Sequence, residues 1–227
     1  MLKKATYGLI AILVIVFIIV NVYGSPDQTF DKYGFSGEKL LGGEVWTLVT
    51  SIFLHGNPAH LLLNCIALFF FGRALESEVS SKALILIFFL GGIVGNLFVL
   101  FAYPASQIVV GASGAVFAVM GTGILLAPMD LVFYPAPVPV PLALIGIVIA
   151  ISETMAFIAG PADNIAHAAH LGGLVAGMLF GLREGESKKG LIIIAVMFVI
   201  ILLMPNIWSV LNEISYLNIL TSQLGGL

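Results

Sequence analysis

The sequence predicts an all-α polytopic membrane protein. Of its 227 residues, 60% are apolar and only 9% are charged, whereas a soluble domain has about 45–50% apolar and about 25% charged residues. The net charge is −3, and no basic stripe is present that could bind the phosphates of a nucleic acid. A soluble domain and a nucleic-acid-binding protein are therefore excluded, and function is expected to depend on polar residues inside the bilayer.

Charges, prolines and turn residues divide the chain into seven predicted membrane spans, each near the length that crosses a bilayer as a helix. The spans run from Ala5 to Tyr23, His55 to Gly72, Ala83 to Ala102, Gly111 to Ala127, Pro139 to Ala159, Ala166 to Leu182 and Leu191 to Pro205. The first run is longer than the core of a signal peptide and is expected to remain as a helix. A single membrane domain is predicted over residues 1–227, with a core at about 5–183, an extra helix at about 191–205 and a tail at 206–227.

The basic residues orient these spans. With the N-terminus in the cytoplasm, seven of the nine Lys and Arg residues are cytoplasmic, and only Lys32 and Lys39 lie outside. A multi-pass protein of the cell (plasma) membrane is predicted, with a cytoplasmic N-terminus and an external C-terminus. The long outer segment 24–54 is expected to be ordered, since structureless loops of that length are uncommon.

Polar residues occur at a similar depth in three of the spans. His60 and Asn64 lie one turn apart on the second span, Ser113 is near the start of the fourth, and His170 is in the sixth. Measured along the helix axis from the predicted cytoplasmic end of each span, His60 and His170 lie at about 20 Å, Asn64 at about 14 Å and Ser113 at about 22 Å. A polar group in lipid is costly unless it is satisfied, so this common level indicates a function.

A serine and a histidine at one level can act as a nucleophile and a general base. The histidine takes the hydroxyl proton as the oxygen attacks a carbonyl, and returns it to the leaving amine. His60, Asn64 and backbone N–H groups near Ser113 could bind the developing oxyanion. This pattern favours acyl transfer, most simply amide hydrolysis. Each residue alone also has a structural interpretation, because small and polar residues pack and clamp membrane helices.

Two further side chains lie near this level. His167, one turn before His170, is expected either to hold water or backbone near the site or to have a purely structural role. Glu153, in the outer third of the fifth span, is expected to contact solvent at a gate, with a triad-like role as the alternative.

Small residues predict how the helices pack. Gly173, Gly177 and Gly181 recur every fourth residue along the sixth span, a pattern that allows close approach to the fourth span. The single cysteine, Cys65, lies in an apolar run and is interpreted as a core residue rather than a redox or metal group.

Three sequence motifs hold these residues. Residues 55–64 read HGNPAHLLLN, residues 111–114 read GASG, and residues 169–173 read AHLGG. Together they resemble the motifs of the rhomboid family of intramembrane serine proteases, in the family's order and on its second, fourth and sixth helices. The resemblance extends from about Trp46 to Gly181.

The resemblance implies a rhomboid-like six-helix bundle plus one additional C-terminal transmembrane helix. It implies Ser113 as nucleophile, His170 as general base and acid, and an oxyanion hole from His60, Asn64 and the Ser113 amide. Supporting roles near the site would fall to His55, Phe117 and His167. No metal or organic cofactor is implied. The expected partners are the lipid bilayer and single-span transmembrane substrates, cut near the outer membrane face.

Two positions depart from the family's usual pattern. Thr47 follows Trp46 where arginine is common, which argues against an arginine anchor for the outer segment. Phe117 replaces a tyrosine found in some members, and its ring can still stack on His170.

Two other classes of protein are alternatives to a protease. A catalytically silent rhomboid-like protein that binds transmembrane clients would lack the nucleophile or the base, and both are present here. A transporter or haem protein is suggested by the four histidines, and the HExxH motif of membrane zinc proteases is absent from the sequence.

Overall fold

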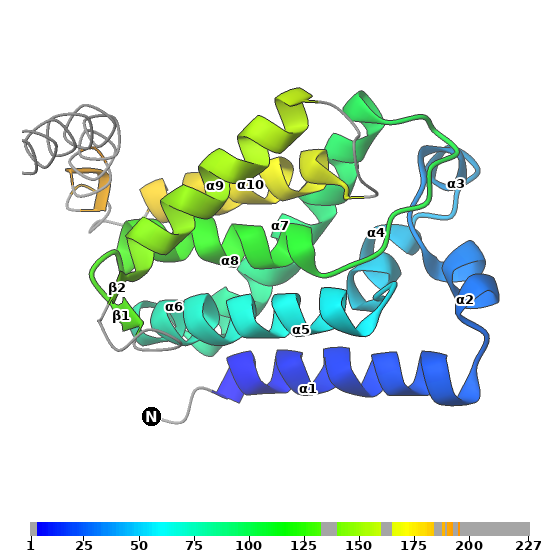
Figure 1. Cartoon of the computed structure of the whole chain (residues 1–227), viewed down its shortest axis with the longest axis horizontal. Helices are drawn as coiled ribbons and strands as arrows, with labels where there is room; N and C mark the ends of the chain where they lie inside the picture. Colours follow the sequence, from blue (N-terminus) through cyan, green and yellow to red (C-terminus); the bar gives the residue numbers. More distant parts are fainter. Residues whose placement is uncertain are drawn as a thin grey trace, which may run out of the picture.

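The computed structural model describes residues 4–132, 140–159 and 165–183, together with residues 188, 190–192 and 195. Within these residues the chain is mostly helical, as predicted, and its longer helices run alongside one another (Figure 1). Two short strands, β1 (Leu131–Val132) and β2 (Val140–Pro141), form an antiparallel pair, which the all-α prediction did not include. Most of the predicted seventh span and the whole tail 206–227 lie outside the described residues.

Three helical segments in the described part of the chain are long and apolar enough to cross a bilayer. They are α1 (Lys4–Ile18) with its π-helical continuation η1 (Ile19–Tyr23); α5 (Pro58–Ala67) with η3 (Leu68–Gly72) and α6 (Arg73–Glu78); and α7 (Ser81–Ala102). The remaining long helices are α8 (Ser113–Leu126), α9 (Leu142–Ala159) and α10 (His167–Arg183). The first six predicted spans thus each correspond to a helical segment.

Local capping explains where the observed helix ends differ from the prediction. The second span begins at Pro58 rather than His55, because the Asn57 side chain accepts a hydrogen bond from the His60 N–H at 2.8 Å and the proline occupies the first helical position. The same segment continues past Gly72 to Glu78. The fifth begins at Leu142 rather than Pro139, because the two preceding residues pair with β1.

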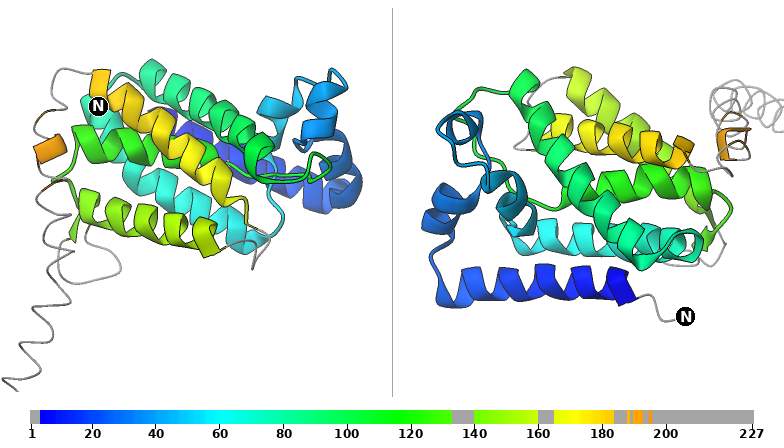
Figure 2. Two further views of the ribbon diagram at one scale, coloured as in Figure 1. Left: turned by 90° about the horizontal axis from the view of Figure 1, so that it is seen from above. Right: turned by 180° about the vertical axis from the view of Figure 1, so that it is seen from behind.

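Helix α8 lies at the centre of the bundle. Every residue from Gly114 to Leu125 is buried, and α7, α9, α10 and the α5–α6 segment all pack against it (Figure 2). A Cβ added to Gly177 of α10 would lie 2.6 Å from the carbonyl carbon of Ala118, so the two backbones are in direct contact. The predicted close approach of the sixth span to the fourth is confirmed.

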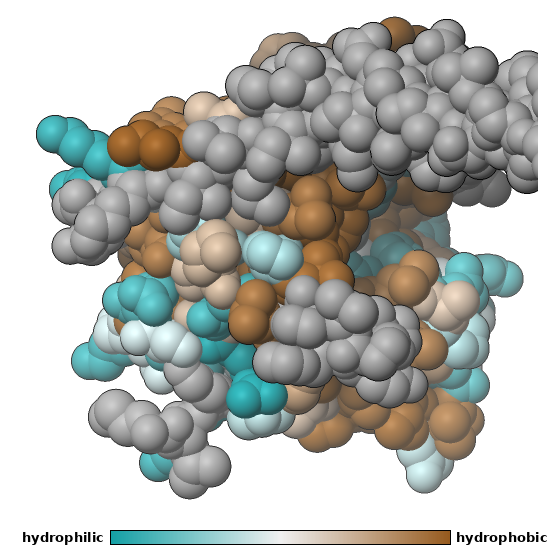
Figure 3. Space-filling view, turned by 60° about the vertical axis from the view of Figure 1, so that its left-hand side comes forward, coloured by the Kyte–Doolittle hydropathy of each residue, from teal (hydrophilic) through white to brown (hydrophobic). Residues whose placement is uncertain are grey.

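The outside of the bundle is apolar. Helix α1 exposes Ile12, Ile15 and Ile18 on one side while it buries Leu9 and Leu13 on the other. On the face shown in Figure 3, brown apolar surface is flanked by teal polar patches. Exposed apolar side chains around backbone groups that are satisfied within helices are what a lipid environment requires.

The segment between α1 and α5 is ordered, as predicted. It contains α2 (Pro26–Tyr33), α3 (Gly37–Leu41), α4 (Thr47–Thr50) and η2 (Ser51–Phe53). These helices lie at the end of the bundle opposite the start of α1 and the β1–β2 pair (Figure 1).

Backbone and side-chain bonds hold this outer segment to the bundle. Phe35 is fully buried and exchanges two backbone hydrogen bonds with Val109, at 3.0 and 2.8 Å. The Asn96 amide of α7 donates to the Leu48 carbonyl and to the Ser51 hydroxyl, both at 2.9 Å. The segment is therefore fixed on the same side of the bundle as the loop that leads into α8.

Candidate active site

The loop that enters α8 brings Gly111 against His60 and next to Ser113. Gly111 has φ +135°, a conformation that side chains rarely adopt, and a Cβ there would lie 2.8 Å from His60 Nε2 and 3.7 Å from Ser113 Oγ. The absence of a side chain at Gly111 therefore lets the His60 imidazole pack directly against the loop, close to the Ser113 hydroxyl. Ser113 is the first residue of α8 and is partly exposed.

The backbone of this loop is held from two sides. The Gly111 N–H donates to the Ser51 carbonyl at 2.9 Å, and the Ala112 N–H donates to His55 Nε2 at 3.5 Å. The N–H groups in the first turn of α8, beginning with Ser113, have no partner within the helix and carry the positive end of its dipole. They are available to an anion beside the Ser113 hydroxyl.

The second helix contributes His60 and Asn64, and His55 lies in the loop just before it. The His55 ring is buried and packs edge-on against the His60 ring, with centroids 5.0 Å apart. The Asn64 amide donates to the His60 carbonyl at 2.9 Å and is itself buried. His60 thus packs against Gly111, while His55 supports both the ring of His60 and the loop.

His170 is held rigidly on α10. Its ring stacks on Phe117 of α8, with centroids 4.5 Å apart and planes 7° from parallel, which confirms the predicted stacking. Its Nδ1 lies 2.7 Å from Glu153 Oε2, and the residue is 8% exposed. One face and one ring nitrogen are therefore engaged, and Nε2 is directed elsewhere.

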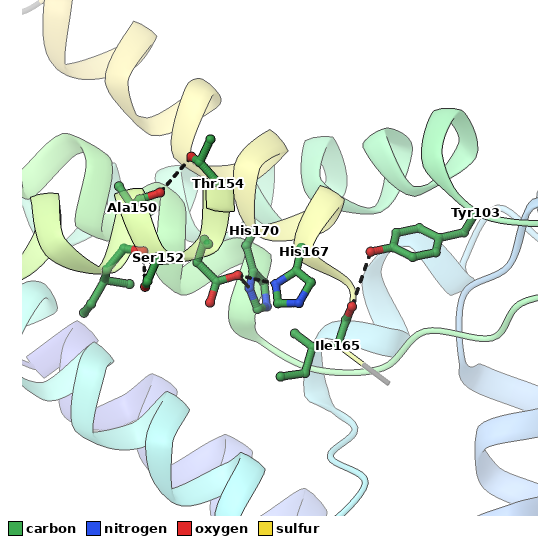
Figure 4. Close-up of polar contacts among 9 residues, drawn as sticks. Tyr103, Ala150, Ser152, Thr154, Ile165, His167 and His170 are labelled. Carbon is green, nitrogen blue, oxygen red and sulfur yellow. Dashed lines mark hydrogen bonds and ion pairs between the residues drawn. The ribbon is translucent and has the colours of Figure 1, made fainter. Parts of the chain in front are cut away.

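The carboxylate of Glu153 joins both histidines of α10. The same oxygen, Oε2, lies 2.7 Å from Nδ1 of His167 and 2.7 Å from Nδ1 of His170, and Figure 4 shows the two rings side by side. The Glu153 side chain is only 18% exposed. Its predicted contact with solvent is therefore limited, because the carboxylate is bonded to both histidines of α10. The signal in the sequence was a carboxyl group at the depth of the serine and histidine.

The start of α10 is tied to α7. The Tyr103 hydroxyl donates to the Ile165 carbonyl at 3.3 Å, just before the helix begins (Figure 4). This bond and the contact of α10 with α8 fix the start of the helix and therefore the position of His170.

The three side chains Glu153, His167 and His170 also have the composition of a metal site. One ligand atom from each lies within 4.8 Å of the others. Zinc bonds of about 2.0–2.2 Å in tetrahedral geometry would separate its ligand atoms by about 3.3 Å. The observed 2.7 Å from oxygen to each nitrogen is the length of a charge-assisted hydrogen bond instead.

Together, the apolar helices and the polar cluster at the buried ends of α8 and α10 define an integral membrane protein. The chain belongs to the rhomboid family: the Rhomboid domain matches residues 42–187. The family predicted from the three motifs is thereby confirmed.

Several named proteins are similar to the chain. It is 30% identical over 190 residues to Rhomboid protease GluP of Bacillus subtilis, which covers 82% of the chain and 36% of GluP. It is 27% identical over 201 residues to Rhomboid protease AarA of Providencia stuartii, which covers 78% of the chain and 71% of AarA. It is 30% identical over 188 residues to RHOMBOID-like protein 12, mitochondrial, of Arabidopsis thaliana, which covers 75% of the chain and 55% of that protein. The chain thus spans little more than a third of GluP.

Proposed function

We propose that the chain is an intramembrane serine endopeptidase, with Ser113 as nucleophile and His170 as general base. The observation that supports this proposal is the contact between Gly114 and Ala169, the residues next to Ser113 and His170. A Cβ on Gly114 would lie 3.2 Å from the carbonyl oxygen of Ala169, so the backbones beside the serine and the histidine touch. The relatives named rhomboid proteases support the same activity.

The chemistry follows from these two groups. Ser113 Oγ attacks the scissile carbonyl, its proton passes to His170 Nε2, and the carbonyl π electrons move onto the oxygen. When the oxyanion re-forms the carbonyl, the C–N bond breaks and His170 gives the proton to the leaving amine. Water repeats the sequence on the acyl-enzyme, which releases the new carboxyl end and restores the serine.

The proposed oxyanion site lies beside Gly111 and Ser113. His60 Nε2 borders it, and the Asn64 amide and the N–H groups at the start of α8 supply further donors. Donors fixed in advance stabilise the charge at no reorganisation cost, and each one is worth about 10²–10³ in kcat.

The length of α8 supports a site within the bilayer. Its 14 residues span about 21 Å, less than the ~30 Å of the hydrocarbon layer. With the proposed topology of six helices plus one, a cytoplasmic N-terminus and an external C-terminus, Ser113 lies below the outer surface of the plasma membrane. The proposed substrates are single-span transmembrane proteins, which reach the serine from the surrounding lipid and are cut near the outer face.

Cleavage by reconstituted protein tests this function. Ser113→Ala and His170→Ala should each abolish cleavage of a single-span substrate in liposomes and labelling by a fluorophosphonate, with little change in Tm. The matched control is Ser152→Ala, which removes an exposed hydroxyl that donates to the Ile149 carbonyl of its own helix at 2.8 Å. Undiminished cleavage by Ser113→Ala, or a wild-type chain that binds the substrate without cutting it, would refute the proposal.

A further inference from the structure

We propose that Glu153 is a positioning residue for His170, so that the site works as a serine–histidine–glutamate unit rather than a dyad alone. This role rests on the proposed peptidase activity. It is carried by one contact: Glu153 Oε2 lies 2.7 Å from His170 Nδ1, from α9 to α10.

The contact selects the tautomer of the base. An ionised carboxylate only accepts hydrogen bonds, so the proton between Oε2 and Nδ1 belongs to the imidazole. Neutral His170 then has its lone pair on Nε2, the atom that must receive the Ser113 proton. In a serine protease of another fold, the wrong tautomer after loss of the buried acid lowers kcat about 10⁴-fold.

The same contact stabilises the charged form of the base. When His170 takes up the serine proton it becomes an imidazolium, and the Glu153 carboxylate lies directly against it in a site with little solvent. A hydrogen bond to a charged group is about twice as strong as a neutral one. The attraction is larger after proton transfer than before it, so it lowers the barrier rather than the KM.

His167 completes the arrangement by holding the carboxylate. Its Nδ1 donates to the same Oε2 at 2.7 Å, from one turn earlier on α10. Phe117 covers the face of the His170 ring. The ring is therefore fixed by stacking and the carboxylate by a second donor, so that neither needs to reorganise during the reaction.

Two substitutions separate charge from shape. Glu153→Gln keeps the length of the side chain and an acceptor oxygen but removes the charge, whereas Glu153→Asp keeps the charge on a shorter side chain. Loss of the charge-assisted bond predicts a kcat at least about 10-fold lower for Glu153→Gln, and as much as about 10⁴-fold lower when the glutamine N–H faces Nδ1 and selects the wrong tautomer, with KM and Tm close to wild type. Glu153→Asp should retain more activity than Glu153→Gln. The rate of fluorophosphonate labelling should fall in parallel with kcat, since it needs the base but not the transmembrane substrate.

The control is Glu78→Gln, the same chemical change at an exposed carboxyl group on α6, which should leave kcat unchanged. A wild-type kcat in Glu153→Gln, a loss that appears as a raised KM or a lowered Tm, or a higher activity in Glu153→Gln than in Glu153→Asp would overturn the positioning role. Stoichiometric zinc in the purified protein, with activity lost on chelation, would overturn it in favour of a metal site. Activity that survives Ser113→Ala would instead refute the peptidase mechanism, whatever the Glu153 variants show.

Discussion

Adding a single methyl group at Gly177 should separate the two helices that hold the serine and the histidine. A Cβ there would lie 2.6 Å from the carbonyl carbon and 2.7 Å from the Cα of Ala118, and closer still to its oxygen, whereas ordinary contact begins at 3.4 Å. The added Cβ would meet backbone atoms of Ala118, which, unlike a side chain, cannot rotate out of the way. The helices must move apart by about 1 Å, and a misplacement of that size can lower the rate about 100-fold.

Alanine substitutions at two other glycines, one on α10 and one on α1, are the controls for this prediction. At Gly181 the Cβ would meet the Leu125 side chain at 2.9 Å, which can rotate, and at Gly8 of α1 nothing lies within 4 Å. We expect kcat/KM to fall about 100-fold for Gly177→Ala, to change little for Gly181→Ala and not to change for Gly8→Ala. Overpacking should also lower the free energy of unfolding of Gly177→Ala by about 1–3 kcal/mol.

The assay is cleavage of a single-span substrate in liposomes, with Tm followed in detergent. Wild-type kcat/KM and Tm in Gly177→Ala would refute the inferred backbone contact. Equal losses in all three variants would show that glycine matters for its flexibility rather than for the space that it leaves.

Two further substitutions test the proposed oxyanion site and the end of the bundle at which α1 begins. Gly111→Ala should slow both cleavage and fluorophosphonate labelling at least about 100-fold, because φ +135° strains an alanine and its Cβ would lie 2.8 Å from His60 Nε2; a wild-type labelling rate would place the oxyanion elsewhere. Glu76→Ala should lower stability by about 1–2 kcal/mol without changing kcat, because its carboxylate accepts hydrogen bonds from the Ala5 and Thr6 N–H groups at the start of α1, at 2.9 and 3.1 Å; an unchanged Tm would count against this cap.

Much of the fold could be predicted because the bilayer imposes simple rules on a sequence. A run of about 20 apolar residues has few alternatives to a membrane helix, and six of the seven predicted spans correspond to helical segments in the described part of the chain. The residues expected at the site, Ser113, His170, His60 and Asn64, could be proposed because polar groups inside such runs are rare and costly. Their catalytic roles remain predictions.

The errors at helix ends have local causes. The second span begins at Pro58 because the Asn57 side chain caps it, and the fourth begins at Ser113 because Gly111 adopts a positive φ. A hydropathy pattern does not contain either effect, because both depend on one side-chain bond or one backbone angle.

The partners of individual polar groups depend on how the helices rotate against one another. Glu153 is 14 residues from His167 and 17 from His170, and no periodicity along the chain shows that one carboxylate oxygen meets both rings. The spacing of Gly173, Gly177 and Gly181 predicts one close helix contact, yet the first two meet backbone and the third meets a side chain. Composition and spacing are local properties of the chain and determine which segments become membrane helices. The meeting of Glu153 with His170 is set by the packing of α9 and α10 around α8, which no single segment encodes.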